Sequence, residues 1–279
     1  MSRRVTVVLA GILLLGLITV SGPASAEPDP APIGRPLYLA LGNSLAVGVG
    51  ASSPAVTGYV PQLYELLRQQ LACQPAGRPS CRSLALRNLG VGGATSTTLI
   101  ATQLPAAVAE LQARNNDPNP HNDVRVVTID IGGNDLFGVV SSSCTAGLTP
   151  ECAALIQARL QTFAVNFTQI LAQLRAAAGP DTVIIAMTYY NPLPSCRLAS
   201  LAPLADAVLE GGLGVAVGLN DLIRSIAADH GVLVAETYGQ LGPGELVGGS
   251  DCLHPNDAGY QVITEAFAAA LTEAQPQAA

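Results

Sequence analysis

Residues Leu37 to Gly48, LYLALGNSLAVG, place a short apolar run directly before a glycine and the polar pair Asn43-Ser44. An uninterrupted apolar run of this length is typical of a strand that is buried on both faces of a parallel sheet. In open parallel sheets, binding sites form outside the carboxyl ends of the strands. The stretch therefore predicts a buried strand that presents Ser44 at the edge of a sheet.

Similar short apolar runs alternate with helical patterns along the rest of the chain. The expected strands are 36–42, 83–90, 124–132, 182–190 and 231–236. The expected helices are 59–72, 97–114, 154–178, 218–230 and 255–274, with Pro105 either kinking or dividing the second. This alternation predicts an α/β fold, a flavodoxin-like three-layer α/β/α sandwich with a five-stranded parallel sheet. Residues 136–150 and 191–217 are expected to be long connections that wall a pocket beside the strand ends.

The N-terminus has the features of a secretory signal peptide. Arg3 and Arg4 precede an apolar run, and SGPASA ends in the small residues of a cleavage site after Ala26. We therefore expect residues 1–26 to be removed and the protein to be secreted, by the general or the twin-arginine route. An uncleaved membrane anchor is the alternative. Residues 27–279 then form one domain, with an extended lead-in at 27–36 and a disordered tail at 275–279.

Cysteine usage agrees with export. The chain has six cysteines, an even number that suggests disulfides in an exported protein. Two pairs of neighbouring cysteines each bracket a short polar segment, so we expect each of these pairs to be bonded. The two remaining cysteines are then expected to bond to each other. The expected disulfides are Cys73–Cys81, Cys144–Cys152 and Cys196–Cys252. Free thiols in a cytosolic protein are the alternative. There is no C-x-x-C, and the three histidines are scattered, so we expect no metal and no cofactor.

The charged residues exclude several functions. The formal net charge is −7, and no basic patch is evident, which argues against nucleic acid or an anionic membrane surface as a main partner. Every basic residue is Arg, and the absence of Lys excludes a Schiff-base lysine and a Ser-Lys dyad. We expect a monomer that acts on a small molecule or a lipid.

Residues suited to nucleophilic catalysis follow several of the expected strands. Ser44 follows the first strand, a glycine-rich turn with Gly93 follows the second, and Asn134 follows the third. Asp251 and His254 follow the fifth. Of the three histidines, His254 alone has a carboxylate three residues before it and a helix starting beside it, which makes it the candidate base for a serine nucleophile.

This set of residues resembles the GDSL, or SGNH, hydrolases, and the resemblance extends over residues 37–257. The match consists of Ser44 in GNSL, Gly93 in NLGVGGATS (with Gly92 as the other register), Asn134 in GGND, and Asp251 with His254 in DCLH. The blocks occur in family order, each at the end of a strand. One position departs from the family pattern, because Asn43 stands where the family usually has Asp before the serine.

The resemblance implies hydrolysis of carboxylic esters through an acyl-enzyme on Ser44. His254 would act as the base and Asp251 would orient it. The Ser44 N–H, the Gly93 N–H and the Asn134 side-chain amide would form the oxyanion hole. Asp135 is assigned to structure, holding its turn.

Other functions stay open at this point. Esterase, lipase or phospholipase action, acyl transfer and carbohydrate deacetylation all use the same machinery. A silent secreted binding module is an alternative of a different class. A phosphoesterase lacks evident metal ligands, and GNSLA lacks the last glycine of the G-x-S-x-G motif of α/β-hydrolases. Apolar segments in 191–217 and the absence of Trp favour an acyl chain over a sugar.

Overall fold

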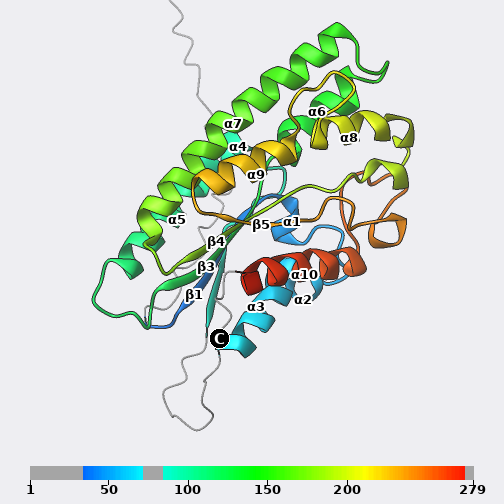
Figure 1. Ribbon diagram of the computed structural model, residues 1–279. Coiled ribbons are helices and arrows are strands. Elements are labelled where there is room, and N and C mark those ends of the chain that lie inside the picture. Colours follow the sequence, from blue (N-terminus) through cyan, green and yellow to red (C-terminus); the bar gives the residue numbers. More distant parts are fainter. Residues whose placement is uncertain (1–33, 72–83, 274–279) are drawn as a thin grey trace, which may run out of the picture.

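A five-stranded sheet forms the centre of the computed structural model, which describes residues 34–71 and 84–273 (Figure 1). All neighbouring strands pair in parallel, in the order β2-β1-β3-β4-β5. The strands are β1 (Leu37–Gly42), β2 (Ala85–Asn88), β3 (Val124–Asp130), β4 (Val183–Met187) and β5 (Leu233–Ala235). This is the flavodoxin-like strand order, so the predicted fold class is confirmed.

The strands are buried because helices cover both faces of the sheet. Every residue of β1 is buried, as are six of the seven in β3. The strands are shorter than predicted, most clearly the one expected over 182–190. That segment leaves the sheet after Met187, where β5 has no further residue to pair with it. Tyr189 and Tyr190 then become available to line a pocket.

The helices form two layers (Figure 1). On one face α3 (Tyr59–Leu71) packs against α10 (Asp257–Glu273), with the short helices α1 (Ser44–Val47) and α2 (Pro54–Thr57) beside them. On the other face α7 (Pro150–Ala178) lies between α5 (Leu104–Asn115) and α9 (Leu219–Asp229). The predicted helix over 97–114 is divided, since α4 (Ser96–Thr102) ends before Gln103 and Pro105 falls in the first turn of α5.

Two helices occur where long connections were predicted, and those predictions were wrong. They are α6 (Gly133–Ser143) and α8 (Ala202–Glu210), together with the 3₁₀ turns η1 (Leu193–Ser195) and η2 (Ala199–Leu201). The third 3₁₀ turn, η3 (Pro243–Glu245), precedes α10. Glycine and three consecutive serines give α6 a low helix propensity. It is helical because buried Leu136 and Val140 pack one turn apart.

Two of the predicted disulfides lie in the described residues. Cys144–Cys152 joins the end of α6 to the start of α7, and Cys196–Cys252 joins two loops at the same edge of the sheet. The predicted Cys73–Cys81 bridge lies outside the described residues. So do the signal peptide, most of the lead-in and the tail.

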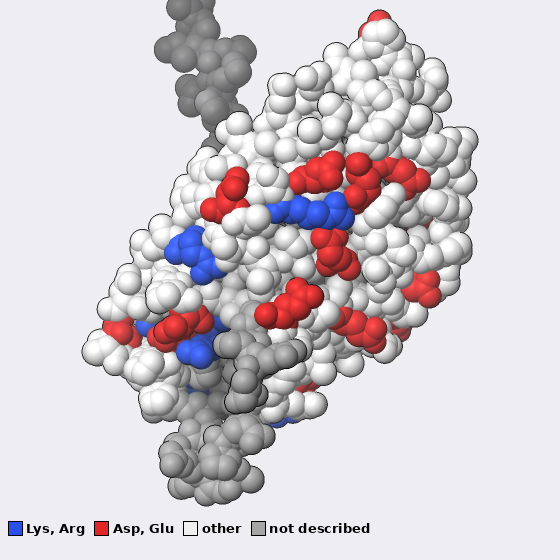
Figure 2. Space-filling model, viewed as in Figure 1, with Lys and Arg blue, Asp and Glu red and all other residues white. Residues whose placement is uncertain are grey.

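The surface carries more acidic than basic side chains on the face with α9 and α10 (Figure 2), in keeping with the net negative charge of the chain. Within residues 34–71 and 84–273, no helix combines the length and the apolar character needed to cross a membrane.

Candidate active site

The turn after β1 holds Ser44 at the first position of α1. Asn43 caps this helix, because its Oδ1 accepts a hydrogen bond of 2.9 Å from the Leu45 N–H. Gly42 has a φ of 157°, and a Cβ there would lie 2.3 Å from the Asp130 carboxylate. Glycine is therefore required at the end of β1, and its absent side chain lets Asp130 lie directly beneath the turn.

Asp130 is a buried carboxylate that the sequence analysis did not single out. Its Oδ1 accepts the Asn43 N–H at 2.9 Å and its Oδ2 accepts the Tyr59 hydroxyl at 2.5 Å. The Ala46 N–H also bonds to it. Burial raises the pKa of Asp130 to about 7, although these three hydrogen bonds act in the opposite direction. A visible signal was the acidic residue inside the otherwise apolar run VVTIDIG.

One amide of this turn is left without a partner. In the described part of the chain, no acceptor is bonded to the Ser44 N–H. The neighbouring amides of Gly42, Asn43 and Leu45 each have an acceptor. The Asp130 carboxylate accepts the N–H of Asn43, and the Asn43 side chain accepts the N–H of Leu45. Between them, the N–H of Ser44 is left free.

Ser44, His254 and Asp251 form a continuous chain of hydrogen bonds. The Ser44 Oγ lies 2.9 Å from Nε2 of His254, and Nδ1 of His254 lies 2.8 Å from Oδ2 of Asp251. The other oxygen of Asp251 accepts the N–H groups of Leu253 and His254 at 2.9 and 3.0 Å. The structure thus brings together the three residues expected to form a triad. Ser44 follows the first strand of the chain, and Asp251 and His254 follow the last.

Hydrogen bonding lowers the pKa of Asp251. Partial burial raises this pKa, but the bond with the His254 ring and the two backbone N–H groups together outweigh burial. Asp251 is therefore an ionised acceptor at neutral pH. An ionised carboxylate on Nδ1 favours the tautomer in which Nε2 is free to accept the serine proton.

The loop that carries His254 is attached to the loop after β4. Besides the Cys196–Cys252 disulfide, the Arg197 N–H donates to the Gly249 carbonyl at 3.1 Å. The Gly249 N–H in turn donates to the Ser195 carbonyl at 3.1 Å. These contacts fix the backbone on both sides of Asp251.

Asn134 lies in the first turn of α6 and lines the same pocket as Ser44 and His254. Its Nδ2 donates one hydrogen bond of 3.0 Å to the Ala94 carbonyl, which leaves the second hydrogen of the amide for a ligand. Asp135 accepts both the N–H and the hydroxyl of Ser96, at 2.9 and 2.5 Å, as expected for a structural role.

Gly93 lies beside Ala94, in the turn after β2, with a φ of 77° that favours glycine. The residue is exposed, and a Cβ there would meet nothing within 4 Å. Among the described residues, no hydrogen bond joins Gly93 or Gly92 to Ser44 or to Asn134. The turn is thus connected to the site through the Ala94 carbonyl.

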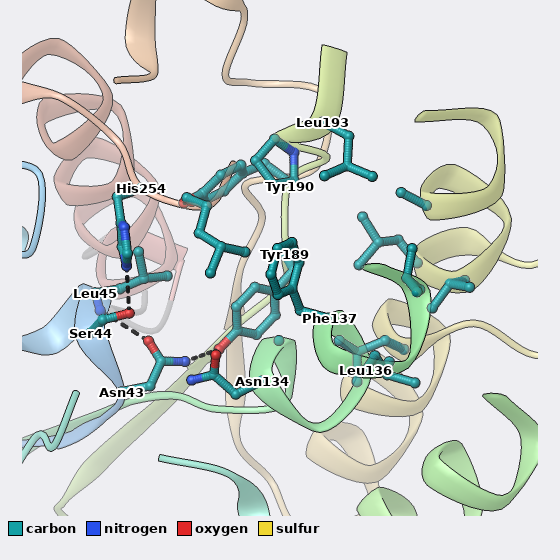
Figure 3. Close-up of a pocket in the computed structure, with 18 residues that line it drawn as sticks. Asn43, Ser44, Leu45, Asn134, Leu136, Phe137, Tyr189, Tyr190, Leu193 and His254 are labelled. Carbon is teal, nitrogen blue, oxygen red and sulfur yellow. Dashed lines mark hydrogen bonds between the residues drawn. The ribbon is translucent and has the colours of Figure 1, made fainter. Parts of the chain in front are cut away.

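The site opens into a cavity of about 80 Å³ that is lined mostly by apolar side chains. Figure 3 shows Ser44 and His254 at one end, with Leu136, Phe137 and Leu193 farther along. Tyr189 accepts a hydrogen bond of 2.7 Å from Nδ2 of Asn43, so the amide that replaces the family's usual Asp has a buried partner. Burial raises the pKa of Tyr189 well above its ordinary value, which keeps its hydroxyl neutral.

The two remaining histidines lie elsewhere. His121 is exposed in the loop before β3, and His230 caps the C-terminus of α9. In residues 34–71 and 84–273, no group of three or more His, Cys, Asp or Glu residues is arranged to hold a metal ion.

Comparison with known proteins identifies relatives of the same architecture. The profile of the GDSL-like lipase/acylhydrolase family matches residues 40–262. A lipase from a goat rumen metagenome is 21% identical, with a TM-score of 0.61, over 85% of this chain and 97% of that one.

Two further solved structures are similar. An extracellular lipase from Streptomyces rimosus is 20% identical, with a TM-score of 0.54, over 85% of this chain and 100% of that one. An acetylxylan esterase from Geobacillus stearothermophilus is 18% identical, with a TM-score of 0.54, over 86% of this chain and 95% of that one. At these identities the structures support the fold alone. No curated protein sequence matches the chain.

Proposed function

Because the chain belongs to the GDSL-like lipase/acylhydrolase family, we propose that it hydrolyses carboxylic esters through an acyl-enzyme on Ser44. The observation that carries this proposal is the line of hydrogen bonds from the Ser44 Oγ through the His254 ring to Asp251. A nucleophile, a base and a group that orients the base are the minimum set for acyl transfer.

In the first half of the reaction, Nε2 of His254 takes the proton of the Ser44 hydroxyl as Oγ attacks the ester carbon. The carbonyl π electrons move onto oxygen and form a tetrahedral oxyanion. As the carbonyl re-forms, the C–O bond to the alcohol breaks, and His254 gives its proton to the departing oxygen. In the second half, water repeats these steps on the acyl-enzyme, and Ser44 regains its proton. Asp251 stabilises the imidazolium that exists between the two transfers.

The oxyanion would be stabilised by three donors. The free Ser44 N–H and the second hydrogen of the Asn134 amide support this role, because both lie at the pocket and neither is bonded within the protein. The Gly93 N–H is assigned from the family resemblance. Loss of one such donor typically costs about 3–4 kcal/mol in the transition state.

The same proposal includes export. Residues 1–26 would be cleaved after Ala26, and residues 27–279 would act outside the cell as a monomeric ester hydrolase. The two disulfides support an oxidising environment, because such bonds are rare in the cytosol.

The test is hydrolysis of p-nitrophenyl acetate and p-nitrophenyl octanoate by the purified mature chain. We expect nitrophenol release by the wild-type protein, and release by the Ser44→Ala variant reduced to near the uncatalysed rate. Equal rates for the two proteins on both esters would favour the silent binding module.

A further inference from the structure

The polar atoms of the pocket are concentrated at the end where the reaction would occur. Asn43, Ser44, Asn134 and His254 lie at that end. The rest of the wall is carbon-rich and comes largely from the two helices that the sequence did not predict. These helices contribute Leu136, Phe137 and Val140 from α6 and Ala205, Val208 and Leu209 from α8.

The two hydroxyl groups along the wall already have partners. The Tyr189 hydroxyl is bonded to the Asn43 amide, and the Tyr190 hydroxyl donates to the Leu253 carbonyl at 2.6 Å. In the described residues, the buried side-chain atoms that lack a partner are those of Arg87, Asn122 and Ser195, and none of these lines the pocket. The pocket therefore presents few groups that would recognise the hydroxyls of a sugar, and much surface that an apolar group would cover.

A second, more polar groove adjoins the apolar pocket. The two share Phe137, Leu253 and His254 in their lining. The groove is otherwise lined by Ser141, Arg197, Leu198, Ser250, Asp251 and Cys252. A leaving alcohol must be within reach of the His254 proton, and this groove is open to solvent beside that ring.

We propose, on the basis of the ester hydrolysis proposed above, that the apolar pocket between α6 and α8 binds the acyl chain of the substrate. The alcohol part of the ester lies in the polar groove beside His254 and Arg197. The preferred substrates are esters of fatty acids several carbons longer than acetate, with a small or polar alcohol. Val140 and Ala205 determine the length of chain that is accepted.

The expected dependence of kcat/KM on acyl-chain length follows from the burial of methylene groups in the pocket. Each methylene that moves from water into an apolar pocket lowers the free energy of the transition state enough to raise kcat/KM about fourfold. The gain should continue while the chain extends between the helices and stop when the pocket is full. We therefore expect kcat/KM to rise by at least about 100-fold from p-nitrophenyl acetate to p-nitrophenyl octanoate.

The test compares pocket-filling variants on paired substrates. Val140→Phe and Ala205→Leu each add bulk to the pocket wall. Val165→Phe is the matched control, because it makes the same change at an exposed valine of α7 that lines neither the apolar pocket nor the polar groove. The substrates are p-nitrophenyl acetate, p-nitrophenyl octanoate and octyl acetate, which carries its long chain on the alcohol.

We expect the loss in kcat/KM of both filling variants to be at least about tenfold greater on octanoate than on acetate, with the control changing the two rates equally. Retained acetate activity shows that the variants fold and that the proposed reaction is intact. Equal losses on acetate and octanoate by both variants, or no loss by either, would overturn the assignment. So would a preference for octyl acetate that the filling variants abolish, because the pocket would then hold the alcohol. No hydrolysis of any ester by the wild-type protein would instead contradict the proposed function itself.

Discussion

The Ser44 Oγ and Nε2 of His254 lie 2.9 Å apart, although 210 positions separate the two residues in sequence. Contacts around the pair explain how the fold maintains this distance. The Asp257 carboxylate, in the first turn of α10, accepts the N–H and the hydroxyl of Ser52, and the Tyr260 hydroxyl donates to the Val49 carbonyl. The segment after the nucleophile is thus bonded directly to the helix that follows the histidine.

Replacing Asn134 by Ala should lower kcat by about 10²–10³-fold with little change in KM. The amide is expected to bind the oxyanion, which exists only in the transition state. Steady-state kinetics on p-nitrophenyl octanoate measures both constants. Asn166→Ala is a suitable control, because Asn166 donates to Ser96 and Thr97 outside the pocket. A similar loss in both variants would indicate a general structural effect.

The variant Asp251→Asn should retain the fold and lose about 10²–10⁴-fold in kcat. An amide at this position cannot stabilise the imidazolium, and it can hold the His254 ring in the wrong tautomer. Circular dichroism checks the fold and ester hydrolysis checks the rate. A decrease in kcat of less than about threefold would show that Asp251 only stabilises the loop, through its bonds to the backbone of Leu253 and His254.

Asp130 should make stability depend on pH. Burial raises its pKa to about 7 in the folded protein, above its value of 3.8 when unperturbed, so the folded state binds the proton more tightly than the unfolded chain does. The contribution of Asp130 to the free energy of unfolding is complete below about pH 4 and is lost as the pH rises through about 7. Denaturant unfolding across this range should show wild-type stability declining relative to Asp130→Asn by up to about 4 kcal/mol. Parallel pH profiles for the two proteins would contradict this assignment.

The two disulfides should differ in their effect on catalysis. Cys196–Cys252 closes a separation of 56 residues and Cys144–Cys152 one of 8, so their removal should cost about 4 and about 2.5 kcal/mol of stability. Of these two bridges, Cys196–Cys252 is the one that holds the loop of Asp251 and His254. Paired Cys→Ser variants, assayed well below their unfolding temperatures, should therefore show a larger fall in kcat for this bridge. Equal kcat values for the two paired variants would mean that backbone hydrogen bonds alone position the loop of Asp251 and His254.

The sequence predicts the sheet and most of the site because both depend on local patterns. Continuous apolar runs mark the strands, and Ser44, Asn134, Asp251 and His254 follow strand ends that converge on one edge of the sheet. Asn134, however, lies in the first turn of a helix that was not predicted. The helix α6 is rich in residues of low helix propensity, and its stability comes from packing.

Residues 136–150 and 191–217 were expected to wall a pocket and both segments line it, but the helices that shape its wall could not be derived from local patterns. Its walls exist because α6 and α8 lie next to each other, and their contact joins residues about 70 positions apart. The role of Asp130 was hidden for a related reason. A carboxylate within a strand is informative only when its partners, Asn43 and Tyr59, are known.

The most direct test of the central claim is covalent labelling of the nucleophile. The mature chain is incubated with diethyl p-nitrophenyl phosphate, which transfers its phosphoryl group to an activated serine, and is then examined by intact-mass and peptide mass spectrometry. We predict one diethylphosphoryl group per molecule, located on Ser44, with no labelling of Ser44→Ala and labelling of His254→Ala slowed by at least about 10²-fold. A label on another residue, or equal labelling of the wild-type protein and Ser44→Ala, would contradict the account.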